Sequence, residues 1–401
     1  MAALTAGGIE AAYDSKTADR VEGSAPRIAA VDVVRGVAMV LMAIDHVRVY
    51  AGLPAGGPTA GIFFTRWITH FCAPAFVFLA GTGAFLHGKR LGETGALARY
   101  LVTRGLVLVA LELTVVHVAW TFGVDFTPLL AGVIWMIGWC MILLAGLVWL
   151  PTRAIAAFGL VVILFQNALG PLLGALPASL RWIGEILYLG GGVTLGTNGP
   201  TIVVLYVLVP WIGVMAAGYA FGAIVTREAV ARRQLCLRIG VSATALFLVL
   251  GGLAVYLRPA PDGAPPALFR LLNQQKYPAS QLFLLMTLGP TIALLPLAER
   301  ARGWIAQALA TFGRVPLFYY LLHIPLIHAA ALVVSYVREG RVNPWLFDNH
   351  PLPSSPRPGG YMWGLPLLYV VFALVVPMLY AACRWFADVK ARGSQRWLRY
   401  L

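Results

Sequence analysis

The sequence predicts an all-α polytopic membrane protein with about ten transmembrane helices. Of its 401 residues, 60% are hydrophobic and only 11% are charged, and the mean hydropathy is +0.79, which lies outside the range of soluble domains. A transmembrane helix needs about 20 predominantly apolar residues. Runs of this kind fall at 31 to 50, 62 to 86, 101 to 122, 129 to 150, 154 to 171, 201 to 225, 239 to 257, 281 to 298, 316 to 337 and 363 to 386.

Three stretches modify this simple pattern. The first run is predominantly apolar, yet it carries five ionisable side chains, each costly at bilayer depth. The segment from 171 to 200 holds Pro and Gly breaks, so an interfacial or re-entrant helix could lie there. The loop "REGRVNPWLFDNHPLPSSPRPGG" before the last run is rich in Pro, Gly and aromatic residues, which fits either a substrate mouth or an ordinary solvated connection.

The distribution of basic residues predicts the orientation in the membrane. The formal net charge is +14, but the Lys and Arg residues fall between apolar runs, so topology explains them better than a nucleic-acid partner. Most of them lie on the same side of the membrane as the N-terminus, if successive runs cross in alternate directions. The positive-inside rule then places both termini in the cytoplasm. We expect a flexible cytoplasmic tail at 1–27 without a signal peptide, one membrane domain at 28–386 and a basic cytoplasmic tail at 387–401.

The first helix presents a polar stripe. Arg35, Met39, Met42 and His46 follow one another at steps of four, three and four, so they share one face. Arg35 and His46 are then about 16 Å apart along the axis. Asp45 points about 100° away from His46, and it can pair more easily with Arg48, three residues on.

The other ionisable residues within the predicted helices fall into two layers when each helix midpoint is taken as the centre of the bilayer. Measured from each helix midpoint at about 1.5 Å per residue, Glu112 is central and His323 lies toward the cytoplasm. A paired structural network would produce the same layout. We predict an outer layer of His46, Arg48, Arg66, His70 and His117, and an inner layer of Arg35, Arg104 and Arg314.

The two layers suggest a reaction. Arginine pairs well with phosphate oxygens, and an imidazole can abstract a proton from an acceptor group. A long acyl donor with an anionic end, such as a coenzyme A thioester, would use both layers. His46 would act as general base or would first form an acyl-imidazole, and the sequence leaves both routes open. The four cysteines are scattered and give no metal spacing, so we expect no metal.

Five segments resemble a known family. The chain is similar to the bacterial branch of the heparan-alpha-glucosaminide N-acetyltransferase catalytic-domain family from about residue 27 to 386. The first helix also matches the arginine, ten residues, histidine pattern of the related acyltransferase-3 proteins, here Arg35 and His46. The segments are "RIAAVDVVRGVAMVLMAIDHVRVY", "FFTRWITHFCAPAFVFLAGTGAFL", "VVLYVLVPWIGVM", "QKYPASQLFLLMTLGP" and "FGRVPLFYYLLHIPLIH".

The resemblance implies a transmembrane acyltransferase fold and transfer from acetyl-coenzyme A to an acceptor, in the named enzyme the amine of a terminal glucosamine. The lysosomal enzyme has its proposed catalytic histidine in the loop after the first helix, but residues 51 to 61 contain none here. The asparagine that precedes this loop in the lysosomal enzyme is replaced here by Asp45. The resemblance therefore implies His46 as the catalytic histidine only through the acyltransferase-3 pattern, and His70 is a second candidate.

These observations lead to one main hypothesis and two alternatives. We expect an acyltransferase of the bacterial inner membrane that takes acyl-coenzyme A from the cytoplasm and modifies an amine or hydroxyl of a sugar or glycan at the outer side. Membrane lipid and a second copy of the chain are further expected partners. The alternatives are a proton-coupled small-solute transporter, for which the sequence shows no internal repeat, and a structural protein, which leaves the charges of the first helix uncompensated.

Overall fold

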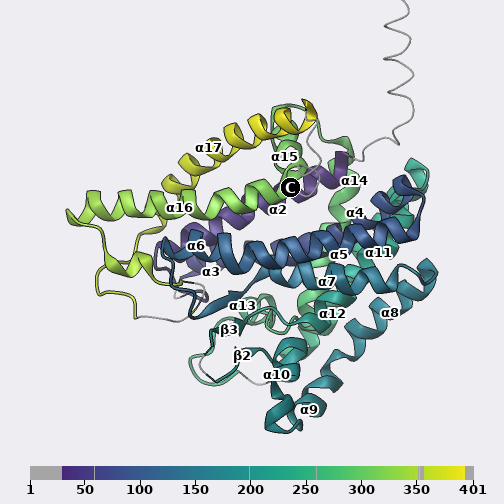
Figure 1. Ribbon diagram of the computed structural model, residues 1–401, viewed down its shortest axis with the longest axis horizontal. Helices are drawn as coiled ribbons and strands as arrows, with labels where there is room; N and C mark the ends of the chain where they lie inside the picture. Colours follow the sequence, from purple (N-terminus) through teal and green to yellow (C-terminus); the bar gives the residue numbers. More distant parts are fainter. Residues whose placement is uncertain are drawn as a thin grey trace, which may run out of the picture.

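The computed structural model describes residues 29–57, 59–197, 199–258, 260–350, 352 and 356–392, and it is an all-α polytopic membrane protein (Figure 1). The predicted tail at 1–27 lies outside the described residues, as does 393–401. In the described part, eight helical segments are long and apolar enough to cross a membrane. They are Ala60–Leu91 (α3 and α4), Thr94–Thr121 (α5 and α6), Thr152–Gly174 (α8 and α9), Leu208–Val225 (α11), Ala229–Leu257 (α12), Gln281–Arg300 (α14), Pro316–Glu339 (α16) and Leu365–Arg392 (α17).

Two further helices lie at the remaining two predicted runs, although neither is among the eight spans. Helix α7 (Val133–Leu147) is apolar but short. Helix α2 (Ala29–Tyr50) has the length of a span and carries four charged residues, Asp32, Arg35, Asp45 and Arg48. In α2, 14 of the 22 residues are buried, and it packs against α4, α14, α16, α17 and α15 (Trp304–Arg314). Its charged groups therefore face protein rather than lipid, as expected of intramembrane charges.

Glycines bring the helices close together. A Cβ on Gly81 of α4 would lie 2.1 Å from the Met215 carbonyl oxygen of α11, and a Cβ on Gly218 would lie 2.0 Å from the Phe78 oxygen. Small residues allow such close backbone approach in membranes, where helix association depends on packing. Comparable contacts join α5 to α7 at Gly105 and Gly138, α8 to α11 at Gly159 and Gly213, α12 to α14 at Gly240 and Gly289, and α2 to α15 at Gly36 and Gly313.

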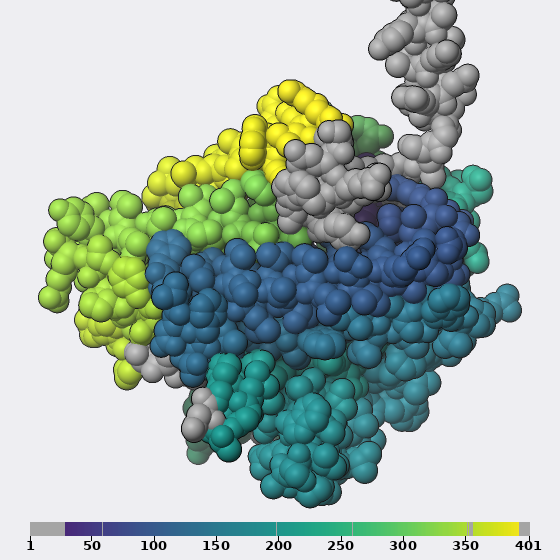
Figure 2. Space-filling model, in the orientation of Figure 1, coloured from purple at the N-terminus to yellow at the C-terminus, as the bar shows by residue number. Residues whose placement is uncertain are grey.

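Three spans are interrupted by a short turn that is not α-helical, one of them at Gln166–Ala168 between α8 and α9. Between α3 (Ala60–Trp67) and α4 (Cys72–Leu91), residues Ile68–Phe71 form a 3₁₀ turn. Pro74 explains it, because proline has no N–H for the His70 carbonyl and crowds the preceding turn. Between α5 (Thr94–Leu111) and α6 (His117–Thr121), residues Glu112–Val116 form a π-helical turn. Figure 2 shows the span formed by α5 and α6 as a continuous band across the visible face.

The structure corrects several predicted boundaries. The apolar runs at 129 to 150 and 201 to 225 begin as strands β1 (Leu129–Ala131) and β3 (Thr201–Val204), which pair in parallel, while β2 (Gly191–Thr194) pairs antiparallel with β3. The segment from 171 to 200 holds only short pieces, among them α10 (Arg181–Gly184). The short helix α13 (Ala267–Leu272) and the amphipathic helix α15 are additional.

Candidate functional site

A cavity of about 390 Å³ lies where α2 begins, and it brings together all three predicted inner arginines, Arg35, Arg104 and Arg314. These residues come from α2, α5 and the end of α15, which are far apart in the chain. Its lining also contains His87, Arg90 and Lys390, which were not among the predicted residues, and Asp32 as its acidic member. The described lining therefore has an excess of positive charge, which suits an anionic ligand with several negative groups.

Backbone carbonyls and hydroxyls hold these arginines. Arg35 Nη1 donates to the Gly313 carbonyl oxygen at 3.1 Å and lies 3.5 Å from the Asp32 carboxylate. Arg314 Nη2 donates to the Thr311 hydroxyl at 2.8 Å. Because Val31 and Asp32 near the start of α2 and Lys390 near the end of α17 line the same cavity, both described ends of the chain lie on one side of the bundle.

The C-terminal half of α2 carries one member of a histidine pair. His46 Nδ1 and His323 Nε2 are 2.6 Å apart, and the two rings stack with centroids 4.8 Å apart. His323 lies on α16 and is fully buried, whereas His46 is half-buried. On the other side of His46, the Trp120 ring meets it edge-on at 5.0 Å. The depth prediction for His323 was wrong, since this residue is level with His46 and not nearer to the cytoplasm.

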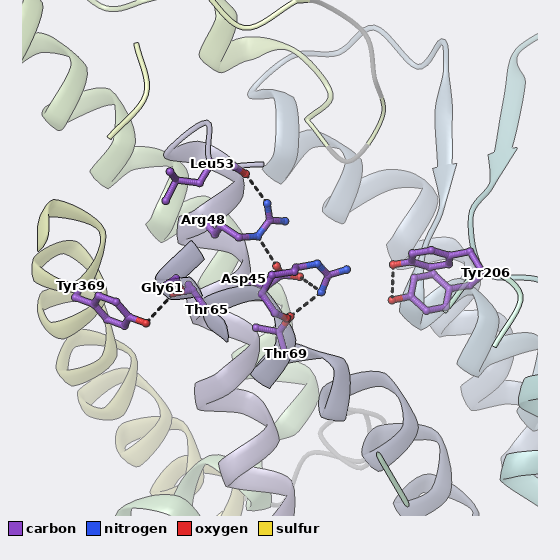
Figure 3. A network of polar contacts seen from close by, with 10 residues as sticks. Asp45, Arg48, Leu53, Gly61, Thr65, Thr69, Tyr206 and Tyr369 are labelled. Atoms are coloured by element: carbon purple, nitrogen blue, oxygen red, sulfur yellow. Dashed lines mark hydrogen bonds and ion pairs between the residues drawn. The ribbon is translucent and has the colours of Figure 1, made fainter. Parts of the chain in front are cut away.

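Asp45 belongs to a separate ion network (Figure 3). As predicted, it pairs with Arg48, whose Nε lies 2.9 Å from the carboxylate. Arg66 reaches the other carboxylate oxygen at 3.3 Å and donates to the Thr69 hydroxyl at 2.6 Å. Arg48 also donates to the Leu53 carbonyl oxygen at 2.6 Å. This network satisfies charges that would otherwise be expensive in the membrane.

A group that sequence reasoning missed borders this network. Lys276, in the connection before α14, is 9% exposed, and its Nζ lies 5.5 Å from the Tyr206 ring centroid and 5.2 Å from that of Tyr277. The two tyrosine hydroxyls are 3.3 Å apart. The sequence signal was weak, because these residues lie in connections, although Lys276 and Tyr277 fall within a segment quoted for the family resemblance.

The remaining predicted residues do not join the histidine pair. His70 is buried, its Nδ1 has no hydrogen-bond partner among the described residues, and its ring meets Phe283 edge-on. His117 bonds through Nε2 to the Asp125 carbonyl oxygen at 2.6 Å. Glu112 is fully buried and accepts from the backbone N–H of Ile134 at the start of α7. In the described residues, no group of His, Cys, Asp and Glu is arranged to hold a metal ion.

The cavity ends before the histidine pair. On α2 its lining stops at Met39, which is seven residues before His46 and so about 10 Å short of it along the axis. Met39 and Met42 are both buried and lie on the same stripe as Arg35 and His46. Along α2, the buried Met39 and Met42 thus lie between Arg35 and His46, and neither His46 nor His323 lines the cavity.

The family model of the heparan-alpha-glucosaminide N-acetyltransferase catalytic domain matches residues 27–261. The match covers more than half of the chain, including all of α2 and the part of the cavity formed by α4, α5 and α7. His323, Lys276 and Arg314 lie beyond it. No individual curated protein matches the chain.

Proposed function

The chain belongs to the heparan-alpha-glucosaminide N-acetyltransferase catalytic-domain family, and we propose that it transfers an acyl group, in the simplest case acetyl, from acyl-coenzyme A on the cytoplasmic side to an amine or hydroxyl of a sugar-like acceptor on the outer side. The observation that carries this proposal is the convergence of Arg35, Arg104 and Arg314 on one cavity. The location in a bacterial inner membrane with cytoplasmic termini is part of the same proposal.

The cavity has the chemistry that the phosphate end of coenzyme A requires. Guanidinium groups donate several hydrogen bonds in a fixed fork that matches phosphate oxygens. Arg90 and Lys390 add two cations to the three predicted ones. Bound there, the donor would direct its thioester along the stripe of α2 toward His46, and the side chains of Met39 and Met42 would change rotamer to let it pass. Methionine suits this role because it is unbranched and flexible.

His46 would carry out the proton transfer. Its Nε2 would accept the proton of the acceptor amine or hydroxyl as that atom attacks the thioester carbonyl carbon. The carbon–sulfur bond breaks, and the proton on His46 passes to the departing thiolate. The products are the acylated acceptor and coenzyme A. Asp45, held by Arg48 and Arg66, would keep the surrounding backbone in place rather than contact His46.

The test is transfer of radiolabelled acetyl from acetyl-coenzyme A to a panel of amino sugars by the purified protein. We expect transfer by the wild type and a loss of at least about 100-fold in His46→Ala, the scale of general acid–base catalysis. Full activity of His46→Ala would remove His46 from the reaction. Uptake of a solute into proteoliposomes without any thioester would instead favour the transporter.

A matched pair of arginine variants tests the cavity. Arg104 lines it, whereas Arg99, on the same helix, has a side chain that is 80% exposed. Loss of a hydrogen bond to a charged group costs about 1.5 to 3 kcal/mol. We therefore expect Arg104→Gln to raise the KM for acetyl-coenzyme A about tenfold or more, with Arg99→Gln unchanged. Equal effects of the two substitutions would contradict a specific phosphate site.

A further inference from the structure

We propose that His323 is a positioning residue that fixes the tautomer of His46, so that Nε2 of His46 is the atom that takes the acceptor proton. This inference rests on the proposed acyl transfer and adds to it a second histidine, supplied by α16 from outside the segment that matches the family. It is carried by a chain of three groups: the Tyr320 carbonyl, His323 and His46.

The first step concerns the proton on His323. Its Nδ1 lies 2.7 Å from the Tyr320 carbonyl oxygen and 3.1 Å from the Tyr319 carbonyl oxygen. Carbonyl oxygens only accept hydrogen bonds, so Nδ1 must carry the hydrogen. His323 is fully buried and has no carboxylate among its hydrogen-bond partners in the described part of the chain. Since burying an unpaired charge is costly, the ring is neutral and its Nε2 holds a lone pair.

The second step passes this constraint to His46. The contact of 2.6 Å between His46 Nδ1 and His323 Nε2 needs one hydrogen, and only His46 can supply it. His46 Nδ1 therefore donates, and in the neutral ring Nε2 is left without a proton. Trp120 packed edge-on at 5.0 Å and the stacked His323 ring hold the imidazole in this orientation. The half-buried member of the pair thus presents a basic nitrogen, and the buried member orients it.

The environment of the pair supports a base that is neutral before the reaction. The charged groups that act on His46 are Asp45 and Arg48 on α2, Arg66 on α3 and Lys276 in the connection before α14. Asp45, the anion among them, is already paired with Arg48 and Arg66, so its carboxylate is engaged by these two arginines rather than by His46. When His46 takes the acceptor proton, the His323 lone pair is already aligned with its Nδ1–H and stabilises the imidazolium.

Three substitutions at His323 separate orientation from packing. Phe keeps the stacked ring without any acceptor. Gln can place an amide oxygen near the position of Nε2 and so accept from His46, whereas Asn reaches only the position of Nδ1. We expect the kcat of acetyl transfer to fall about 100-fold in His323→Phe and His323→Asn and to recover at least tenfold in His323→Gln. The KM for acetyl-coenzyme A should stay within about twofold in all three.

The outcomes are distinguishable from failure of the proposed function. Loss of activity in His46→Ala together with full activity in His323→Phe would overturn the positioning role and leave the acyltransferase intact. Full activity in His46→Ala would overturn the positioning role and remove His46 from the reaction, but acyl transfer itself would stand. Absence of acetyl transfer by the wild type would overturn the proposed function. The double variant His46→Ala with His323→Phe should lose no more activity than His46→Ala alone, because residues that act as a unit are not additive. A further loss would show that His323 acts independently and would contradict the proposal.

Discussion

The carboxylate of Glu112 accepts a hydrogen bond from the backbone N–H of Ile134 across 3.2 Å. It thereby caps the N-terminus of α7, where unpaired N–H groups and the helix dipole favour a negative or polar acceptor. The same carboxyl group contacts the hydroxyl of Tyr320, whose carbonyl orients His323. Glu112, between α5 and α6, thus caps the start of α7 inside the membrane. Through Tyr320 it is also connected to His323 of the candidate site.

Removal of this cap should destabilise the protein. In Glu112→Ala the buried N–H groups at the start of α7 lose their acceptor, which costs about 1 to 3 kcal/mol, whereas Glu112→Gln keeps an acceptor and should lose less. Thermal unfolding in detergent measures both. Identical midpoints for Glu112→Ala and the wild type would show that the cap contributes nothing.

Glycine packing gives a second prediction. In Gly81→Ala the new Cβ would lie 2.1 Å from the Met215 carbonyl oxygen, so α4 and α11 must separate and the unfolding temperature should fall. Gly252, on α12, is the control, because a Cβ there meets nothing within 4 Å. Gly252→Ala should be neutral or stabilising by up to about 1 kcal/mol, the gain in helix propensity. The same drop in both variants would refute the packing argument.

The path between the two layers can be blocked selectively. Met42 is buried between the cavity and His46, and a larger, stiffer side chain there should stop the thioester from reaching the histidine. We expect Met42→Trp to lower kcat at least about tenfold while coenzyme A still raises the unfolding temperature, since ligand binding to the folded state is retained. Met42→Ala should keep activity. Unimpaired turnover by Met42→Trp would mean that the donor reaches His46 by another route.

Acid should weaken the connection between α16 and α17. Burial lowers the pKa of His350 from 6.5 to about 4, so the unfolded chain binds this proton more readily than the folded one. Stability should therefore fall as the pH drops from about 6.5 to about 4, and this contribution should not change further below that range. In His350→Gln the decline of the unfolding temperature over this window should be shallower. Parallel curves for the two proteins would rule out His350 as the titrating group.

The positions of the apolar helices and the inner arginines could be predicted because they depend on composition and on spacing within single helices. The strands β1 and β3 could not, since a short apolar strand that runs into an apolar helix has no periodicity of its own. The partner of His46 was misplaced for a geometric reason. The depth estimate centres every helix on the bilayer, but α16 starts just after Gly313, whose carbonyl is bonded to Arg35. His323, seven residues after Pro316, is thus already level with His46.

The enclosure of α2 has a consequence for how the chain is made. Its four acidic and basic residues would each cost about 2.5 to 3.5 kcal/mol at the centre of a lone helix in lipid. Yet α15, α16 and α17, which cover much of it, lie far downstream in the chain and are synthesised long after it. The charged groups of α2 must therefore remain partly uncovered until these helices have been made. Truncation after α14 should leave α2 unprotected and expose the nascent protein to quality-control proteases.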